Sequence, residues 1–430
     1  MKIAVIGSGI AGLGSAWRLA RAGHAVALFE AGTHFGGHTH TIDVTLDGIR
    51  WGVDTGFLVF NHRTYPLLTR LFDDLRIATT AAEMSFSVTT RTGLDRLEWS
   101  GSNLRGVFAQ PSNLLRPGFL RMLRDILRFN RAATGLARSA ASADSAMSLG
   151  AYLERHRYSV EFRDWYLLPM AGCIWSCPAT QMLQFPLASF IRFCDNHGLL
   201  QLAGRPQWRT VTGGARRYVE RMLLDIERRH IGSPVEAVTR SGAGVQLWLS
   251  GSRAGERFDH VVIATHSDQA LRLLHDSSPD EHDVLGSIRY QANRAVLHTD
   301  TGCLPQRRAA WAAWNYQSSG GREAEVCVHY LLNRLQPLPF STPLLVSLNP
   351  IEMPDAAKVL GEFDYAHPVF DAAAIAAQQK IPVIQGRNNT WFAGAWTGYG
   401  FHEDGLRSGL AVAEAILQQA AADGMLPAAA

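Results

Sequence analysis

The sequence has 430 residues, of which 47% are hydrophobic and 18% are charged. A chain of this size supports about two or three domains with proper cores, which excludes disordered and fibrous architectures. The formal charge of +3, from 41 basic and 38 acidic residues, is too small to indicate nucleic-acid binding. A specific site for a small molecule or a lipid is the better expectation. Only Lys2, Lys358 and Lys380 are lysines, so nearly all basic residues are arginines.

The five cysteines are an odd number spread along a long chain, which predicts reduced thiols rather than a disulfide framework. The N-terminus runs directly into a strand pattern without the features of a secretory signal. No run of about 18 apolar residues is present, so we expect no membrane-spanning helix. We therefore expect a cytoplasmic protein, with peripheral contact at the inner membrane face left open.

The first 30 residues predict a compact β-turn-α-β unit. Lys2 to Gly7 is a short β-rich run, Ile10 to Ala22 has helical spacing, and Ala25 to Glu30 forms the next strand. Such a unit with a right-handed crossover implies a parallel sheet. The fold class expected is α/β, with a Rossmann-like domain.

Two later segments continue this pattern. Phe258 to Thr265 is another buried-strand run, and Thr390 to Ala395 precedes a predicted helix over Leu406 to Ala420. We therefore expect a discontinuous dinucleotide-binding domain formed by residues 1–78, 205–285 and 385–420. Residues 421–430 are expected to form a flexible tail.

The remaining segments, 79–204 and 286–384, are expected to form an inserted, mixed α+β substrate domain. The first contains a predicted strand pair, Met84 to Thr90 and Leu94 to Trp99, followed by helices. The second alternates like antiparallel strands between about Ile288 and Val346.

The strongest motif is G-x-G-x-x-G, Gly7-Ser8-Gly9-Ile10-Ala11-Gly12, placed between the first strand and the first helix. Gly7 permits a tight turn, Gly9 lets the backbone approach a pyrophosphate, and Gly12 allows close helix packing. Glu30 ends the next strand, 18 residues later, where its carboxylate would accept a ribose hydroxyl. This context predicts a dinucleotide site.

The fingerprint alone does not distinguish NAD from FAD, but two further features favour FAD. Phe35-Gly36-Gly37-His38 adds a second glycine pair, Gly36 and Gly37, close to Glu30. The segment Phe392-Ala393-Gly394-Ala395-Trp396-Thr397-Gly398 leads into a helix whose N-terminal dipole would stabilise negative charge on a reduced flavin.

Together these motifs resemble the flavoprotein superfamily of amine oxidases, protoporphyrinogen oxidase and phytoene desaturases. The resemblance sharpens at six motifs, which are Asp54 to Asn61, Met84 to Val88, Ile174 to Pro178, Asn196 to Leu200, Gly204 to Trp208 and Gly398 to Gly405. These motifs are most similar to bacterial FAD-dependent oxidoreductases described only as NAD/FAD-binding proteins. They also resemble the flavoprotein domain of plant cyclopropane fatty acid synthases. The similarity extends to about residue 418 and implies a glutathione-reductase-like FAD domain.

Carried over by position, the resemblance implies specific cofactor contacts. The residues implied to hold the ADP half and the pyrophosphate are Gly7, Gly9, Ala11, Glu30, Gly37 and His38, with Val235 near the adenine. The residues implied to lie near the flavin ring are Gly56, Phe57, Gly394, His402, Asp404, Gly405 and Leu406. The cofactor expected is FAD.

This sequence departs from the amine oxidases of the superfamily at several positions. Those enzymes place an arginine after the glycine pair, a lysine in the substrate domain and a tyrosine in the C-terminal turn. Here His38 follows the pair, Leu406 follows Gly405, and no lysine occurs between Lys2 and Lys358. Amine oxidation by that apparatus is therefore not expected.

The catalytic residues stay open, and the best polar candidates are His402, Glu403 and Asp404. A role in holding the flavin is the alternative for them. His38 and His40 lack a third ligand at metal spacing, so we expect no metal site. Cys173 and Cys177 do not form C-x-x-C, which favours packing over redox chemistry.

The segment from Arg105 to Arg138 carries seven arginines and one acid, Asp125, on an amphipathic pattern. Its apolar positions are Leu115, Phe119, Met122, Leu123, Ile126 and Phe129. Two interpretations stay open: a helix that lies on an anionic membrane through Arg116 to Arg131, or a helix packed on its own domain.

The sequence therefore favours an FAD-dependent oxidoreductase that removes hydride from an apolar, lipid or fatty-acyl substrate. An amine or polyisoprenoid oxidase of the same superfamily is the first alternative. A non-catalytic, flavin-bound partner of a lipid methyltransferase is the second. No nucleic-acid partner is expected.

Overall fold

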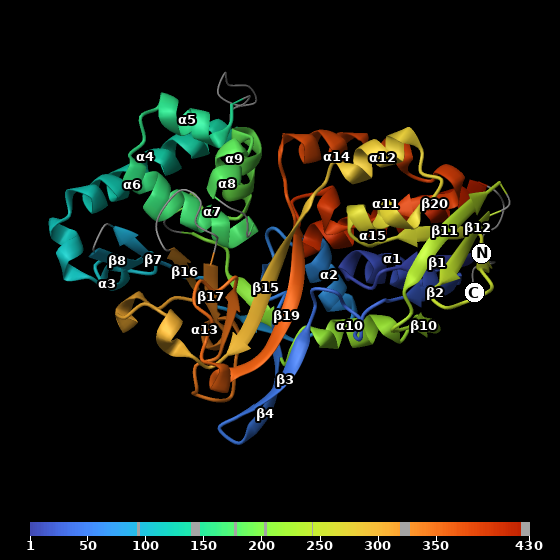
Figure 1. The fold of residues 1–430 in the computed structure, drawn as a ribbon, viewed down its shortest axis with the longest axis horizontal. Coiled ribbons are helices and arrows are strands. Elements are labelled where there is room, and N and C mark those ends of the chain that lie inside the picture. The colour runs from blue at the N-terminus through green and yellow to red at the C-terminus, as the bar shows by residue number, and fades with distance from the viewer. Residues whose placement is uncertain are drawn as a thin grey trace.

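The computed structural model describes residues 1–92, 95–138, 147–175, 179–201, 204–242, 244–318 and 327–422. The chain folds into two halves that share an extended central boundary (Figure 1). One half is built on a five-stranded parallel sheet and the other on a seven-stranded mixed sheet. The mixed α/β class predicted from the sequence is therefore confirmed.

The five-stranded sheet has the order β10-β2-β1-β14-β20, and all neighbouring strands are parallel. Its strands are β1 (Lys2–Ile6), β2 (Ala25–Phe29), β10 (Arg228–His230), β14 (His260–Ile263) and β20 (Thr390–Phe392). The central strands β1 and β14 are almost completely buried, as a parallel sheet covered on both faces requires.

Each face of this sheet is covered by its own layer. Ile3 and Val5 pack toward α1 (Ile10–Arg21) and α15 (His402–Ala422), whereas Ala4 and Ile6 face the opposite layer. The opposite layer contains α11 (Ser267–Leu273), α12 (Pro279–Gly286), α14 (Ala372–Ile384), β11 (Val235–Ser241), β12 (Gly244–Leu249) and β13 (Glu256–Phe258).

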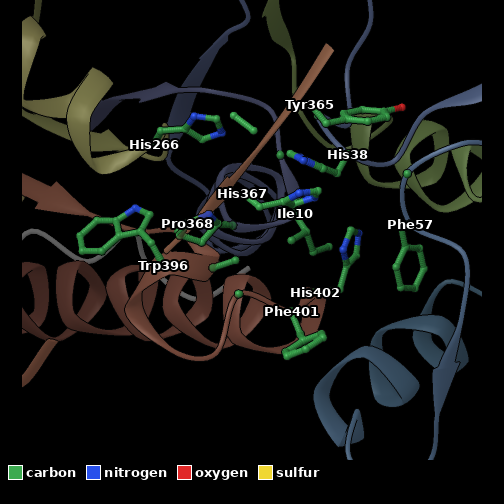
Figure 2. A pocket seen from close by; sticks show the side chains of 18 of the residues that line it. Ile10, His38, Phe57, His266, Tyr365, His367, Pro368, Trp396, Phe401 and His402 are labelled. Atoms are coloured by element: carbon green, nitrogen blue, oxygen red, sulfur yellow. The ribbon is translucent and has the colours of Figure 1, made fainter. Parts of the chain in front are cut away.

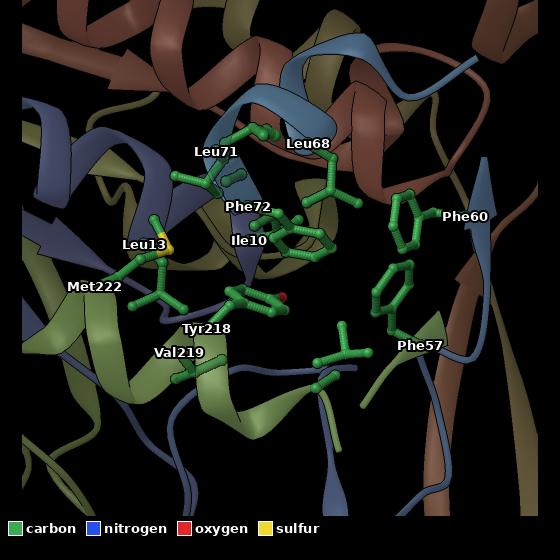
Figure 3. Packing of buried hydrophobic residues seen from close by; sticks show 14 of the residues in the cluster. Ile10, Leu13, Phe57, Phe60, Leu68, Leu71, Phe72, Tyr218, Val219 and Met222 are labelled. Carbon is green, nitrogen blue, oxygen red and sulfur yellow. The ribbon is translucent and has the colours of Figure 1, made fainter. Parts of the chain in front are cut away.

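Two more helices, α2 (Pro66–Asp74) and α10 (Arg216–Leu223), pack into the core beside α1. Figure 3 shows Leu13, Phe72 and Met222 from these three helices packed together. The smaller elements here are β3 (Thr41–Leu46), β4 (Ile49–Asp54), β5 (Phe60–Asn61), β6 (Thr79–Ala81) and β9 (Trp208–Val211).

The seven-stranded sheet has the order β19-β15-β18-β17-β16-β7-β8. Its strands are β7 (Phe86–Thr92), β8 (Asp95–Ser100), β15 (Tyr290–His298), β16 (Trp314–Ser318), β17 (Cys327–Leu331), β18 (Leu345–Leu348) and β19 (Val359–Pro368), with α13 (Leu332–Leu335) beside them. All neighbouring pairs are antiparallel except β16 and β7. The long pair β15 and β19 runs along the boundary between the halves (Figure 1).

A helical unit lies beside the seven-stranded sheet at the outer end of the molecule (Figure 1). It contains α3 (Leu104–Val107), α4 (Pro117–Arg138), α5 (Leu149–Arg155), α6 (Val160–Phe162), α7 (Leu168–Trp175), α8 (Ala179–Gln184) and α9 (Leu187–Asn196). Its core is aromatic, with Phe119, Phe129 and Phe190 almost completely inaccessible. Among the described residues, no helix combines the length and the apolarity needed to cross a bilayer.

Three expected boundaries were wrong. The C-terminal helix begins at His402 rather than Leu406 and continues to Ala422, into the expected tail, of which residues 423–430 lie outside the described ranges. The predicted strand Phe258 to Thr265 is two strands, since Phe258 ends β13 and pairs antiparallel with β12. The first three residues of the expected insertion, Thr79–Ala81, pair with β9 instead of the seven-stranded sheet.

Candidate functional site

One cavity of about 790 Å³ lies between the two halves. The carboxyl ends of β1, β2 and β14 contribute one part of its wall, and strands of the seven-stranded sheet contribute another. Its volume lies within the range of ligand and cofactor pockets, roughly 300–1,000 Å³. In an open parallel sheet, ligands bind outside the carboxyl ends of the strands, which is where this cavity begins.

The N-terminus of α1 opens into the cavity. Gly9 precedes the helix, no side chain caps it, and no acid occurs in its first turn. The first N–H groups of a helix lack intrahelical acceptors and favour anions. A Cβ on Gly9 would meet no atom within 4 Å, so the space in front of this helix end is open.

Gly12, by contrast, does not line the cavity. A Cβ at Gly12 would lie 1.9 Å from the carbonyl oxygen of Gly7, so this position serves the close approach of helix and strand. Of the fingerprint, Gly7 to Ala11 line the cavity and Gly12 does not.

Glu30 lines the cavity at the carboxyl end of β2. Its Oε2 accepts hydrogen bonds from the N–H (3.0 Å) and the hydroxyl (2.5 Å) of Ser8, and its Oε1 accepts from the N–H of Gly32 (2.8 Å). A carboxylate has about four acceptor positions, so Oε1 retains capacity for a further hydroxyl. Val235 also lines this end, where the N–H of Ser233 donates to the carbonyl of Glu30 at 2.8 Å.

Gly36, Gly37 and His38 line the cavity next to the fingerprint. The Nε2 atom of His38 is buried and has no hydrogen-bond partner among the described residues. Burial, followed by neighbouring imidazoles, lowers the pKa of His38 well below its ordinary value, so the ring is neutral. At Gly56, a Cβ would lie 2.2 Å from the carbonyl oxygen of His38, so only glycine permits this close crossing.

His402, the first residue of α15, lies at the meeting point of four segments. Its Nε2 lies 2.9 Å from the hydroxyl of Thr39 and 3.0 Å from that of Tyr218, and its ring stacks on Phe57. Burial lowers the pKa of His402 to about 3, so this imidazole is neutral. Figure 2 shows it between Ile10 and Phe57 in the cavity wall.

Glu403 and Asp404, the other catalytic candidates, do not line the cavity. The two carboxylate oxygens of Glu403 accept the N–H groups of Leu67 (2.9 Å) and Leu68 (3.0 Å), at the start of α2. Oδ2 of Asp404 accepts the N–H groups of Tyr399 (3.0 Å) and Phe401 (3.2 Å). Glu403 therefore stabilises the N-terminal end of α2, and Asp404 stabilises the turn that leads into α15. Their charges lie in the first turn of α15, where they offset the dipole that we expected to act on the flavin.

Gly405 and Leu406 also lie outside the cavity wall because they serve the packing of α15 on α1. A Cβ at Gly405 would meet Ile10 at 2.7 Å, and the side chain of Leu406 would meet a Cβ at Gly14. The cavity wall does include Gly394 and Phe57. Of the turn from His402 to Leu406, the cavity wall includes His402 alone.

The part of the cavity wall formed by the substrate half is apolar and aromatic. Its members in the half built on the seven-stranded sheet, the substrate half, are Met84, Cys173, Ile174, Phe193, His197, Leu199, Trp314, Tyr330, Val346 and Leu348, and β15 and β19 add Tyr290, Tyr365, Ala366, His367 and Pro368. Tyr65, Trp208 and Phe401, from the half built on the five-stranded sheet, belong to the same cavity wall. The charged residues of the cavity wall are Glu30, Glu236 and Arg272, all from the half that carries the five-stranded sheet. Ser176, Cys177 and Pro178 of the resemblance motif lie outside the described residues.

Sequence reasoning missed the contribution of β19. Tyr365 and His367 line the cavity, and Tyr365 packs against His38 with ring centroids 5.0 Å apart. The amide nitrogen of Asn293 donates to Nδ1 of His367 at 2.9 Å, which leaves the proton of the neutral ring on Nε2. Burial lowers the pKa of His367 to about 4. The run Tyr365-Ala366-His367-Pro368 was the signal, since its polar aromatics recur at every second residue of a strand.

A second titratable cluster lies outside the cavity, where His298, Cys303 and His329 offer ligand atoms within 4.8 Å of one another. The hydroxyl of Ser347 lies 2.6 Å from both His298 Nε2 and His329 Nδ1. Nδ1 of His298 accepts the N–H of Asp300 (3.1 Å), and Nε2 of His329 lies 2.7 Å from an amide oxygen. All four ring nitrogens are therefore engaged, which makes this a hydrogen-bond network rather than a metal centre.

The cysteines in the described part of the chain, Cys173, Cys194, Cys303 and Cys327, are free thiols. Burial raises the pKa of Cys303 and Cys327 to about 12, so neither is a thiolate near neutral pH. Packing, as the sequence predicted for Cys173, accounts for its burial in the core beside the cavity.

Comparison with known proteins places these features in a family. The sequence model of the flavin containing amine oxidoreductases matches residues 10–325. A Mycobacterium tuberculosis protein named as a flavin-containing monoamine oxidase is 26% identical over 334 residues, 74% of this chain and 67% of that protein. The carotenoid phi-ring synthase of Streptomyces griseus is 28% identical over 326 residues, 71% of this chain and 59% of the synthase.

Solved structures show the same fold. Cyclohexylamine oxidase from Brevibacterium oxydans superposes with a TM-score of 0.68 at 18% sequence identity, over 97% of this chain and 99% of the oxidase. The residues present at the cavity fit a flavin dinucleotide: a free helix N-terminus behind an open Gly9, a carboxylate at Glu30, and an unpartnered buried nitrogen at His38.

Proposed function

This chain belongs to the flavin containing amine oxidoreductases and is an FAD-dependent oxidoreductase, and we propose that it removes hydride from an apolar substrate. The substrate class that we propose is a lipid or a fatty-acyl chain, so that the reaction is a dehydrogenation or desaturation linked to modified fatty acids. The FAD, when bound, would supply the hydride acceptor, the second hydrogen would leave as a proton to solvent, and oxygen or another acceptor would reoxidise the flavin.

The observation that carries this proposal is the chemistry of the substrate half of the cavity. Its wall contains no carboxylate, lysine or arginine in the described chain. Burial lowers the pKa of His197 in this wall to about 4, so this imidazole is neutral as well. A cationic amine there would be a buried charge without a counter-ion, which is costly, whereas an apolar chain meets matching surface.

We propose that the five-stranded sheet half is the FAD domain, of the glutathione-reductase type. The first turn of α1, with Gly9 and Ala11, would hold the pyrophosphate, and Glu30 would accept a ribose hydroxyl. His38 would donate its unpartnered N–H, and Val235 would lie against the adenine. Gly56, Phe57, Gly394 and His402 would lie near the flavin ring.

The protein's contribution in this scheme is to orient the substrate and exclude water. Trp208, Trp314 and Tyr330 present large apolar surfaces to the cavity, and the stacked pair His402 and Phe57 stiffens its wall. Among the three acid–base candidates only His402 reaches the cavity, and its Nε2 is engaged with two hydroxyls. A positioning role for His402 fits this geometry better than general base catalysis.

Two likenesses support a lipid-like substrate. The motifs around Gly204 to Trp208 and Gly398 to Gly405 resemble the flavoprotein domain of plant cyclopropane fatty acid synthases. The carotenoid phi-ring synthase, named for an apolar polyene product, is among the sequence relatives.

A second candidate function is amine oxidation, which the likeness to the mycobacterial protein named as a monoamine oxidase favours. Against it stands the absence of lysine from the cavity wall formed by the described residues. The chain offers only Lys358 and Lys380 beyond the second residue, and both are outside that wall.

Anaerobic reduction of the bound flavin separates these candidates. The flavin-loaded enzyme is mixed without oxygen with phospholipids, free fatty acids, a polyprenoid, putrescine or cyclohexylamine, and the loss of the yellow absorbance is followed. We expect bleaching with an acyl lipid and none with the amines. Bleaching by the amines alone would overturn the proposal in favour of the second candidate.

A further inference from the structure

Five leucines are exposed on one continuous stretch at the outer end of the molecule. They are Leu104 (78% exposed), Leu114 (52%), Leu115 (86%), Leu120 (47%) and Leu127 (55%). They belong to α3, to the short 3₁₀ turn Pro111–Leu115 and to the first half of α4. Isolated exposed leucines need no explanation, but five within residues 104–127 indicate an interaction surface.

These leucines are not the apolar stripe that the sequence pattern singled out. Phe119, Met122, Ile126 and Phe129 of that stripe pack into the core of the helical unit. The domain-packed interpretation is therefore correct for the inner face of α4. The outer face carries a second set of apolar residues that packing on the domain does not explain.

Arginines are interleaved with the exposed leucines. Leu120, Arg124, Leu127 and Arg131 follow one another at steps of four, three and four, which places them on one face of α4. All four are exposed, and in the described part of the chain no acid pairs with Arg124, Arg131 or the nearby Arg105. Arg121 and Arg128, in contrast, pair with Glu161 and Asp125.

We propose that this leucine–arginine surface, formed by Leu104, Arg105, Leu114, Leu115, Leu120, Arg124, Leu127 and Arg131, docks on an anionic lipid bilayer. The leucines enter the boundary between headgroups and acyl chains, and the unpaired arginines bind lipid phosphates. Charge complementarity selects this occupant, because residues 104–138 carry seven arginines and the single acid Asp125, which is buried.

The position of the surface connects it to the cavity. Helix α4 packs on α9, and Phe193 of α9 lines the cavity. In Figure 1, α4 lies on the outer side of the helical unit and α9 on the side toward the molecule's centre. Docking would therefore hold the wall of the substrate half one helix layer away from the bilayer. The docking proposal stands on the surface alone and does not depend on the proposed reaction.

Vesicle co-sedimentation tests the electrostatic part. The flavin-loaded full chain is mixed with vesicles of phosphatidylcholine alone or of phosphatidylcholine with phosphatidylglycerol. We expect sedimentation with the anionic vesicles only, and weaker binding as salt rises. Each basic residue near an anionic membrane contributes about fivefold, so R124E/R131E is expected to bind at least about 25-fold more weakly. The matched control, R221E/R253E, changes two exposed arginines of the other half and should bind like the wild type.

A second pair of variants tests the leucines. L115S/L127S removes two exposed apolar side chains and should weaken binding by about tenfold for each leucine. L224S changes a leucine that is 73% exposed on the other half and should leave binding unchanged. Equal sedimentation with neutral and anionic vesicles, or undiminished binding by R124E/R131E, would overturn the proposal. Because sedimentation needs no turnover, failure of the proposed reaction would not affect this result.

Discussion

The imidazole of His402 stacks on the phenyl ring of Phe57, with ring centroids 3.8 Å apart and planes 15° apart. His402 opens the last helix, whereas Phe57 follows the turn after β4. Thr39 and Tyr218 bond to the same imidazole. Four segments that are distant in sequence therefore meet at one neutral ring, and the cavity between the two halves depends on their packing.

We expect the contact between α1 and α15 to be too close for any added side-chain atom. A Cβ at Gly409 would lie 2.1 Å from the carbonyl oxygen of Ala11. Gly409→Ala should therefore lower the free energy of unfolding by about 1–3 kcal/mol or more, through overpacking. Gly135→Ala, in a helix where a Cβ meets nothing within 4 Å, should raise it by up to about 1 kcal/mol. Urea denaturation measures both, and equal effects would refute the close packing.

Glu403 is expected to act on stability and not on chemistry. In Glu403→Gln, one oxygen remains, so one of the N–H groups of Leu67 and Leu68 loses its acceptor, at a cost of about 1–3 kcal/mol. Thermal unfolding should show this loss, while the rate of flavin reduction by substrate stays close to that of the wild type. A fall in that rate of roughly a hundredfold or more would instead identify Glu403 as a general base.

Gly9 offers a way to remove the cofactor while keeping the fold. A Cβ at Gly9 meets no protein atom within 4 Å, and its backbone (φ −61°, ψ 174°) suits any residue. Gly9→Val should therefore fold normally but purify without yellow flavin absorbance, because the side chain fills the space of the pyrophosphate. Gly242→Ala, also without neighbours within 4 Å, should retain the flavin. A flavin-loaded Gly9→Val protein would contradict the assigned site.

Acid is expected to destabilise the protein through its buried imidazoles. Burial lowers the pKa of His329 and of His402 to about 3, below the ordinary value of 6.5. Between pH 6.5 and 3 the unfolded chain binds protons that the folded chain does not. Each ring should therefore remove about 1.4 kcal/mol of stability per pH unit as the pH falls.

The buried carboxyl of Asp54 opposes this trend. Burial raises the pKa of Asp54 from 3.8 to about 7, so between pH 3.8 and 7 the folded state holds a proton that the unfolded state has lost. The contribution of Asp54 to the stability of the protein therefore falls as the pH rises. Urea denaturation between pH 6 and 4 tests the balance with His402→Asn. Its slope should be smaller than that of the wild type by about 1.4 kcal/mol per pH unit, and an unchanged slope would refute a neutral, buried His402.

Local patterns allowed the first β-α-β unit and its glycine fingerprint to be predicted, since spacing alone specifies them. The same reasoning failed at His402, Glu403 and Asp404. A glycine-rich run and three polar residues indicated a turn, whereas acids are also favoured in the first turn of a helix. The partners of Glu403, the N–H groups of Leu67 and Leu68, lie more than 300 positions away in the sequence.

The spacing of residues in the sequence could not predict that β19 forms part of the cavity wall. His367 is oriented by Asn293, 74 positions earlier, through the register of β15 and β19. The exposed leucines were missed for a related reason. Helical periodicity identified the inner face of α4 through Phe119 and Phe129, but which face meets the domain depends on tertiary packing.

The central claim, that this flavoenzyme oxidises an apolar lipid, is tested most directly by mass spectrometry of the lipids in cells that express the wild type or Gly9→Val. We predict acyl or polyene lipids that have lost two hydrogen atoms in the wild-type cells and not in the variant cells. Identical lipids in both, together with oxidation of amines by the purified wild type, would contradict the claim.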